Sequence, residues 1–212
     1  MLCILVPMAR QKDPAVRTLL VERAAHMLRV REPITLRSLV AGTGVSTMAV
    51  YTHFGNMDGM WMAVRQEGFT RLARRFAEVP VTTDPVADLT ALVAAYLGNA
   101  LEHPDLYRVM FDANFDLEDL KAADATLEHM VQAALRAQDA GRFHAGTTPL
   151  DLATQSWAVG HGVVSLVANG PLPRETLAHC PVLLEALFTR TGDEPGRCAD
   201  SVARGWDPAL AG

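Results

Sequence analysis

Residues 43 to 60, TGVSTMAVYTHFGNMDGM, are rich in short polar side chains and contain no Lys or Arg, although the surrounding chain is rich in Arg. The hydroxyl groups of Ser46, Thr47, Tyr51 and Thr52 can bond to phosphate oxygens or to base edges, and the carbon atoms of Thr and Met can contact the methyl group of thymine. Short side chains also permit close approach to a duplex. The composition of this stretch therefore favours a surface that enters a DNA groove.

Two short helices joined by a glycine turn would position this stretch. Thr35 can cap a helix that ends near Gly44, and Ser46 can cap a second helix that stops at Gly55. Two such helices form a helix-turn-helix, in which the second helix enters the major groove. The alternative is a polar helical hairpin that only packs on the preceding helix.

The outward face of the second helix supplies the candidate base contacts. If Val45, Val50 and Phe54 turn inward, the remaining positions face outward, with Tyr51 at the flank. No Arg lies in this helix to read guanine through two hydrogen bonds, so we expect modest direct readout and a contribution from DNA shape. The residues expected to contact DNA are Arg37, Ser46, Thr47, Met48, Tyr51, Thr52 and His53.

Charge is distributed unevenly along the chain. Residues 1–75 carry eleven Lys or Arg and five Asp or Glu, whereas residues 76–212 carry eight and nineteen. This asymmetry suggests an N-terminal part that meets a polyanion, with attraction from residues such as Arg10, Lys12 and Arg17. Chance sorting of solvated faces is the other interpretation.

Helix signals occur along most of the chain, and no stretch alternates with period two between turn signals, so we predict an all-α fold of about nine helices. Asp13-Pro14 and Asp84-Pro85 each combine an N-cap with a first-turn proline, and Thr148 with Asp151 resembles a capping box. From Gly192 onward apolar periodicity stops, which predicts a loose tail. The expected helices cover about 14–30, 36–43, 47–54, 57–77, 85–102, 106–111, 120–140, 149–168 and 174–191.

The opening octapeptide MLCILVPM is too short to span a bilayer and has no cleavage pattern behind it, so we expect a cytoplasmic protein. Met8 is a possible alternative start. Three cysteines without a CxxC pair suit a reducing compartment and argue against structural zinc. The expected organisation is a flexible arm at 1–12, a helix-turn-helix domain at 13–57, a helical effector-binding and dimerisation domain at 58–191 and a loose tail at 192–212.

The segment ITLRSLVAGTGVSTMAVYTHFGNMDGM resembles the signature of the tetracycline-repressor-like (TetR) family of bacterial regulators. The family pattern runs through a GVS turn to Y-x-H-F and then opens a helix. Met57 departs from this pattern, because the family often has a Lys there; the resemblance implies that a phosphate contact is lost and that DNA affinity or its salt dependence is lower. The matching residues are Gly44, Val45, Ser46, Tyr51, His53 and Phe54.

Two downstream segments, EHPDLYRVMF (102–111) and WAVGHGVVSLVANG (157–170), resemble the WHG type of TetR C-terminal domain, named for residues that correspond here to Trp157, His161 and Gly162. The resemblance implies a homodimer, paired through helices near 149–168 and 174–190, and an apolar effector pocket. A buried, hydrogen-bonded structural role is the other interpretation of His161. The residues expected to bind the effector are Tyr96, Tyr107, Phe111, Trp157 and His161, with Phe115 and Met130 as further candidates for the cavity wall.

The expected function is a ligand-responsive repressor that binds a near-palindromic double-stranded operator as a homodimer and is released by a small, largely apolar effector. No cofactor, metal or membrane is expected. A dimeric helical adaptor that has lost DNA binding is the main alternative, favoured by Met57 and the weakly basic second helix. A helical metalloenzyme is the third possibility, although HExxH, the ExxH pairs of di-iron bundles, GxSxG and GxxxxGK[ST] are all absent.

Overall fold

The computed structural model describes residues 13–111, 116–117, 119, 121–168, 170–207 and 210. The expected arm at 1–12, with Arg10, Lys12 and the alternative start at Met8, lies outside these residues, as do Phe115 and Leu120. Every regular element in the described ranges is a helix, which confirms the predicted all-α class. These elements are α1 (Pro14–Arg29), α2 (Leu36–Val40), α3 (Thr47–Phe54), α4 (Met57–Ala77), α5 (Pro85–Glu102), α6 (Pro104–Met110), α7 (Lys121–Asp139), α8 (Pro149–Ala168), the 3-10 helix η1 (Arg174–Ala178), α9 (His179–Arg190) and α10 (Pro195–Gly205).

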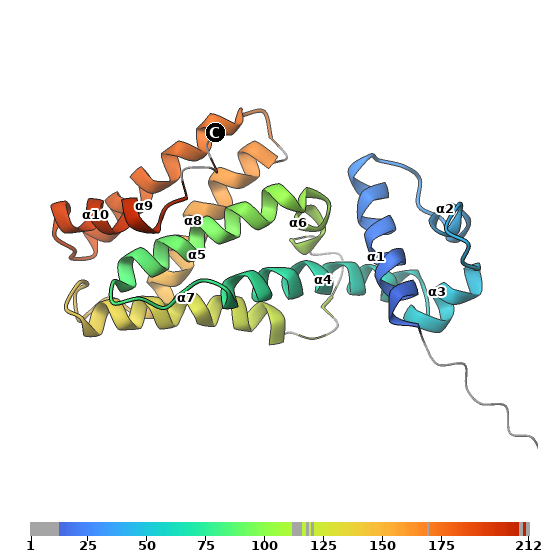
Figure 1. Ribbon diagram of the computed structural model, residues 1–212, viewed down its shortest axis with the longest axis horizontal. Coiled ribbons are helices and arrows are strands. Elements are labelled where there is room, and N and C mark those ends of the chain that lie inside the picture. Colours follow the sequence, from blue (N-terminus) through green and yellow to red (C-terminus); the bar gives the residue numbers. More distant parts are fainter. Residues whose placement is uncertain are drawn as a thin grey trace, which may run out of the picture.

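The N-terminal helices form a small body around their own hydrophobic core. Figure 1 shows α1, α2 and α3 gathered at one end of the molecule, with α4 leading from them to the other helices. Leu20 and Met27 of α1, Leu39 of α2 and Val50 of α3 are fully buried in this core. The start of α4 completes it with Met60. Each short helix therefore contributes one apolar face, and none of them could bury that face alone.

A second and larger core lies among α4, α5, α7, α8, α9 and α10. Helix α4 belongs to both cores, because Met60 and Val64 lie in the first and Leu72 and Phe76 in the second. The short helix α6 is shared in the same way: Leu106 and Val109 pack in the N-terminal core, whereas Tyr107 and Met110 pack in the larger one. Helices α4 and α6 thus connect the two bodies, because each of them contributes side chains to both cores.

Helix α4 and helix α6 approach each other closely at Gly68. A β-carbon at Gly68 would lie 2.3 Å from Cγ of Met110, a distance that side chains do not adopt. Arg65, one turn earlier on α4, donates from Nε to the backbone oxygen of Met110 at 2.9 Å. This glycine is therefore required by close packing and not by an unusual backbone angle.

The predicted loose tail is wrong for its first half, where α10 forms a helix that packs on α5. Pro195 occupies the first turn, and the Glu194 carboxylate caps the helix by accepting hydrogen bonds from the backbone nitrogens of Gly196 and Arg197, at 3.0 and 2.7 Å. Cys198 and Val202 are buried on one face, four residues apart. The sequence does carry a local signal for this helix, because Glu194-Pro195 repeats the cap-plus-proline pattern of Asp13-Pro14 and Asp84-Pro85.

One other expectation needs correction, because helix α2 ends at Val40, several residues before Gly44. The helical region predicted over 174–191 is present as η1 followed by α9. Pro181 lies in the first turn of α9, where its missing N–H costs no helical hydrogen bond, so it starts the main part of this region and does not kink it. The remaining predicted helices agree with the structure to within a few residues.

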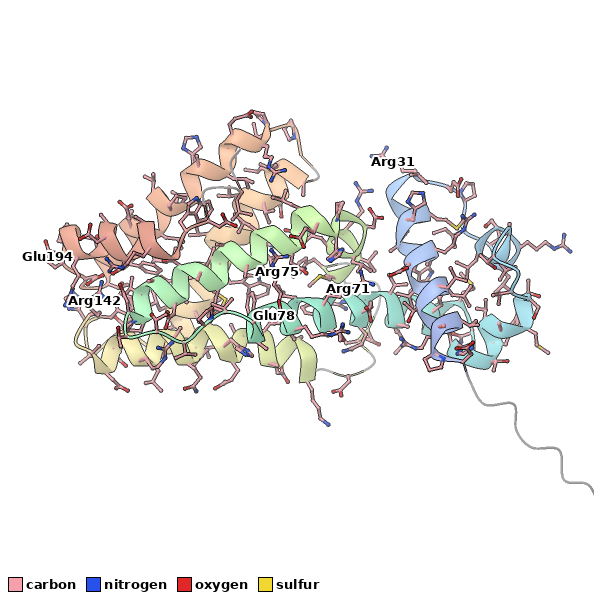
Figure 2. The ribbon with its side chains drawn as sticks, in the orientation of Figure 1. Arg31, Arg71, Arg75, Glu78, Arg142 and Glu194 are labelled. Carbon is pink, nitrogen blue, oxygen red and sulfur yellow. The ribbon has the colours of Figure 1, made fainter. Side chains whose placement is uncertain are left out.

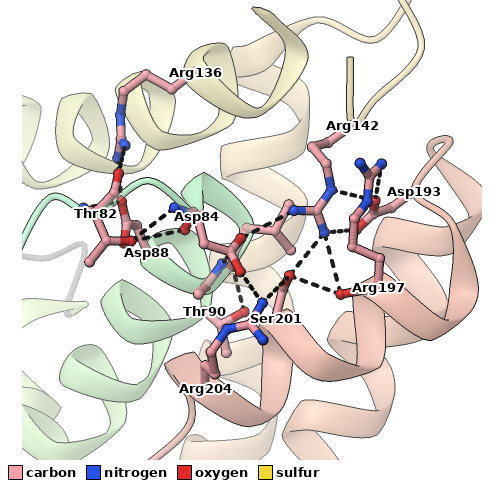
Figure 3. Close-up of polar contacts among 12 residues, drawn as sticks. Thr82, Asp84, Asp88, Thr90, Arg136, Arg142, Asp193, Arg197, Ser201 and Arg204 are labelled. Carbon is pink, nitrogen blue, oxygen red and sulfur yellow. Dashed lines mark hydrogen bonds and ion pairs between the residues drawn. The ribbon is translucent and has the colours of Figure 1, made fainter. Parts of the chain in front are cut away.

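A buried ion network holds α10 in place (Figure 3). Arg142, which follows α7, has a side chain only 7% exposed, and its Nε and Nη2 atoms donate to the two carboxylate oxygens of Asp193, each at 2.6 Å. The same guanidinium reaches Asp84 at 3.2 Å and the hydroxyl of Ser201 at 2.9 Å. Arg204 of α10 also pairs with Asp84. The network therefore joins the starts of α5 and α10 to the loop after α7.

The pKa of the Asp84 carboxyl reflects this environment. Burial raises this pKa, but hydrogen bonds from Arg204, Ser201 and the backbone N–H of Ala87, together with the charge of Arg142, outweigh burial and lower it to about 2. Asp84 is also the N-cap of α5. Its ionised form is therefore the one that the fold stabilises.

We expect Arg142→Met to lower the free energy of unfolding by about 3–5 kcal/mol, because it leaves the carboxylate of Asp193, whose side chain is 0% exposed, without its bidentate partner. Urea unfolding followed by circular dichroism measures this loss. Arg197→Met is the matched control, since Arg197 pairs with the same carboxylate but is half exposed, and it should cost no more than about 1 kcal/mol. Equal losses in the two variants would contradict a dominant role for the buried pair.

The lowered pKa of Asp84 predicts a pH dependence of stability. Its ionised carboxylate stabilises the folded state above the ordinary value of 3.8, and this contribution is lost as the pH falls through about 2. Wild type should therefore be more stable than Asp84→Asn near pH 6, and the difference should shrink between about pH 4 and pH 2. Urea midpoints of both proteins across this range provide the measurement; a constant difference would show that the ion pairs of Asp84 add nothing to stability.

Candidate DNA-contact helix and effector cavity

The turn between α2 and α3 is built from glycines and one threonine. Gly42 and Gly44 have positive φ values of 72° and 73°, which side chains rarely adopt. Thr43 lies between them; its hydroxyl donates to the backbone oxygen of Val40 at 2.7 Å and accepts from the N–H of Val45 at 3.2 Å. These bonds fix where α3 begins. Ser46 has the extended backbone of an N-cap, although its side chain makes no capping hydrogen bond.

Helix α3 lies at the surface of the N-terminal body and is anchored from one side. Its residue Val50 is fully buried against the N-terminal core. Phe54 is half-buried, with the guanidinium carbon of Arg17 at 5.6 Å from its ring centroid. Gly55, with φ of 79°, ends the helix. One face of α3 therefore packs on α1 and α4, and the opposite face meets solvent.

The predicted DNA contacts fall into two groups. Met48 and Tyr51 are 67% and 49% exposed, which is unusual for large apolar side chains. Three other residues of α3 belong to the predicted set. Thr52 is exposed, whereas Thr47 and His53 are half-buried. Ser46 and Arg37 are exposed as well. The structure thus places all seven on the same small body, and five of them face solvent.

Two arginines connect α4 to the helices on either side (Figure 2). Arg71 pairs with Glu67 on its own helix and with Glu22 of α1, at 2.9 and 3.0 Å. Arg75 pairs with Glu102 at the end of α5 at 2.5 Å. Helix α4 therefore has polar as well as apolar links to both bodies.

A cavity of about 240 Å³ lies among α4, α5, α7 and α8. Three of the five predicted effector residues, Tyr96, Phe111 and Trp157, line it, and so does Met130. Sequence reasoning missed most of the wall, because apolar residues on the stripes of α4 and α7 look the same whether they fill a core or line a hollow. The lining residues not predicted are Arg65, Phe69, Leu72, Phe76, Leu117, Ala123, Asp124, Thr126 and Leu127.

Tyr107 and His161 are not among the residues that line this cavity, and their contact with an effector stays a prediction. Nδ1 of His161 is 2.8 Å from the hydroxyl of Tyr96 and 3.1 Å from that of Tyr107, and the Tyr107 hydroxyl is also 2.7 Å from the hydroxyl of Ser165. The ring of Phe111 packs edge-on against the imidazole. These contacts give Nδ1 of His161 and the two tyrosine hydroxyls hydrogen-bond partners inside the protein.

Burial controls ionisation in this cluster. It lowers the pKa of His161 and raises the pKa of Tyr96 and of Tyr107. The imidazole is therefore neutral near pH 7, and its Nδ1 shares hydrogen bonds with the two tyrosine hydroxyls. These three side chains form an uncharged hydrogen-bonded cluster that reaches the cavity at Tyr96.

The cavity can hold a small, mainly aromatic or aliphatic molecule. Phe69, Leu72 and Trp157 supply apolar and aromatic surface, whereas Arg65 and Asp124 are the charged residues of the lining. Asp124 is exposed and Arg65 is half-buried. Such a pocket recognises shape through its walls and orientation through a few polar groups.

Other kinds of chemistry have little support in the described part of the chain. There, no three His, Cys, Asp or Glu side chains are grouped to hold a metal ion. Burial raises the pKa of the thiols of Cys180 and Cys198 to about 12 and about 11, so neither is a thiolate near pH 7. None of the helices described is both long enough and apolar enough to cross a membrane.

Residues 89–191 match the family described as "Tetracyclin repressor-like, C-terminal domain". No curated protein matches the chain. Among solved structures, a protein of unknown function from Rhodococcus sp. RHA1 has a TM-score of 0.70 and 22% identity, covering 89% of this chain and 100% of its own. The TetR family transcriptional regulator PfmR from Thermus thermophilus has a TM-score of 0.66 and 15% identity, with 82% and 98% covered. RolR, solved in complex with resorcinol, has a TM-score of 0.61 and 13% identity, with 93% and 97% covered.

These similarities join the N-terminal and C-terminal observations. The structural matches share the helical fold across most of the chain, and the family match covers the part of the larger body between residues 89 and 191, without α4 and α10. The WHG subtype suggested by Trp157, His161 and Gly162 is not tested by this match and stays a prediction. Residues 89–191 therefore correspond to a tetracycline-repressor-like (TetR) C-terminal domain, and most of the chain shares the helical fold of the solved structures it matches.

Proposed function

We propose that the chain is a ligand-responsive transcriptional repressor that binds a near-palindromic operator as a homodimer and is released by a small, largely apolar effector. The observation that carries this proposal is the exposure of α3. Helix α3 buries Val50 and leaves Met48 and Tyr51 exposed, so its outer face carries large side chains with which nothing in the described part of the protein packs. The groove of a duplex fits a single exposed helix of this size.

Apolar residues on α8 and α9 support the homodimer. Leu150 and Leu166 of α8 and Val182 and Leu183 of α9 are exposed. A two-fold pair formed through these helices would use the same surface on both copies. Such a dimer could place its two α3 helices in successive major grooves, about 34–36 Å apart, which is why the operator should be nearly palindromic.

The cavity supports control by a small molecule. RolR, which shares the fold, has been solved with resorcinol, a small aromatic compound. In this chain Phe69, Leu72 and Phe76 of α4 form part of the wall, and the first turns of the same helix pack beneath α3. An effector that binds one position of α4 better than another would change the separation of the two α3 helices, and hence the affinity for DNA.

The adaptor without DNA binding remains the second candidate, and Met57 is the residue that favours it. Met57 is half-buried and packs against the N-terminal core, so this position contributes to packing in place of a phosphate contact. A dimer with no preference for its own upstream DNA over random duplex would support the adaptor. A strict monomer without that preference would contradict both candidates.

We expect the double variant Tyr51→Ala and Thr52→Ala to lose operator binding while the oligomeric state stays unchanged. The reason is that both side chains are exposed on α3 and bury nothing in the protein core. Fluorescence anisotropy with DNA from upstream of the protein's own gene, against random duplex, measures the loss. Val81→Ala, exposed and remote in sequence from α3, is the control. Unchanged affinity in the double variant would remove these side chains from the contact.

We expect Val182→Glu to convert the dimer to a monomer, because it would bury two charges, one from each copy, in an apolar interface. Light scattering coupled to gel filtration measures the mass. Val81→Glu is the matched control, since Val81 is equally apolar and even more exposed but lies outside α8 and α9. A dimer that survives Val182→Glu would place the interface elsewhere.

A further inference from the structure

The outward pole of α3, by which we mean the face opposite the buried Val50, is formed by Met48 and Thr52. At about 100° per residue, Met48 and Thr52 lie about 160° and 200° around the helix from Val50, whereas Tyr51 lies about 100° away. Thr47 and His53 lie only about 60° to either side of Val50, which agrees with their partial burial. The centre of the exposed face is therefore the pair Met48 and Thr52, one turn apart, and not the whole set of polar residues.

This pole offers no free hydrogen-bond donor. Met48 is 67% exposed and ends in a thioether, which donates nothing and accepts weakly. The hydroxyl of Thr52 donates its single proton to the backbone oxygen of Met48 at 2.9 Å. What remains to face a partner is the thioether of Met48, the methyl of Thr52 and the acceptor side of one hydroxyl.

The major groove contains one apolar group that distinguishes a base pair, the 5-methyl of thymine. Donors that read guanine or adenine through two hydrogen bonds are Arg, Lys, Asn and Gln, and none of these occurs in Thr47–Phe54. We propose that Met48, with Thr52 beside it, reads thymine methyl groups near the centre of each operator half-site. This inference rests on the proposed function, because it names the base chemistry of the DNA that α3 would bind.

Tyr51 would have a different role from Met48 and Thr52, because it would contact the DNA backbone and not the bases. It lies on the flank of the helix, where a side chain meets the sugar-phosphate backbone and not the base edges, so its hydroxyl fits a phosphate oxygen. Positioning would then come from the flank and from basic residues of the N-terminal body, and sequence selection from the apolar pole. Tyr51→Phe should weaken binding to all DNA alike, whereas changes at Met48 should alter only the preference for thymine.

Deoxyuridine provides the direct test, because it differs from thymidine only by the missing methyl. Once footprinting has located the protected half-sites, each thymine in them is replaced in turn and the dissociation constant is measured by anisotropy. Loss of one buried methyl should weaken wild-type binding about fourfold, at one or two symmetric positions. Thymines outside the half-sites are the DNA control and should show no change.

Variants at Met48 assign the effect to this residue. Met48→Gln keeps the length of the side chain but makes it polar, so its affinities for thymine and deoxyuridine should become equal at those positions. Met48→Leu is the matched control and should retain the difference. Because Met48 is mostly exposed, both variants should unfold at the same temperature as wild type. If one of them does not, the deoxyuridine measurements on the wild-type protein decide the question.

The outcomes separate this inference from the proposed function. Preference for the upstream DNA over random duplex, without any weakening by deoxyuridine, would overturn the reading of thymine and leave the repressor proposal standing. A deoxyuridine effect that persists unchanged in Met48→Gln would overturn the role of Met48. No preference for upstream DNA at all would contradict the proposed function itself.

Discussion

Helix α4 is the constraint on which the rest of the structure depends, because one unbroken helix of 21 residues belongs to two hydrophobic cores. Met60 and Val64 cannot move relative to Leu72 and Phe76 without bending it. Interiors are close-packed, so a displacement at one end is passed on and not absorbed. The N-terminal body that holds α3 and the cavity in the larger body are therefore mechanically connected by this helix.

Helix α6 strengthens this connection from the side. Its two faces lie in different cores, and the space at Gly68 that admits Met110 leaves room for nothing larger. Arg65 both lines the cavity and bonds to the backbone of Met110. The same side chain thus contacts the hollow and the junction, while the buried ion network around Arg142 holds the far end of the larger body in a fixed arrangement.

The two candidate binding surfaces share an apolar character and differ in how polarity is used. Beside the cavity, hydrogen bonds join the hydroxyls of Tyr96 and Tyr107 to His161. On α3, the hydroxyl of Thr52 is bonded to the helix itself. In both places these polar groups are paired within the protein, and much of the surface left for a partner is carbon. Attraction to phosphate must then come from basic residues around α3, in keeping with the excess of Lys and Arg in residues 1–75.

The sequence by itself determined most of the helices, because caps, first-turn prolines and glycine stops act within a few residues; Asp13 and Asp84 each cap the helix predicted for them. It also located α3 and its buried Val50. Only the tertiary structure decided how α10 is held against the rest of the larger body, since Arg142 and Asp193 are 51 residues apart, and that Phe69 lines the cavity whereas His161 is not in its lining. Ion pairs between distant residues and the shape of a cavity depend on how the helices pack. The apolar pattern of one helix shows which face is buried, but not which other helices pack against that face.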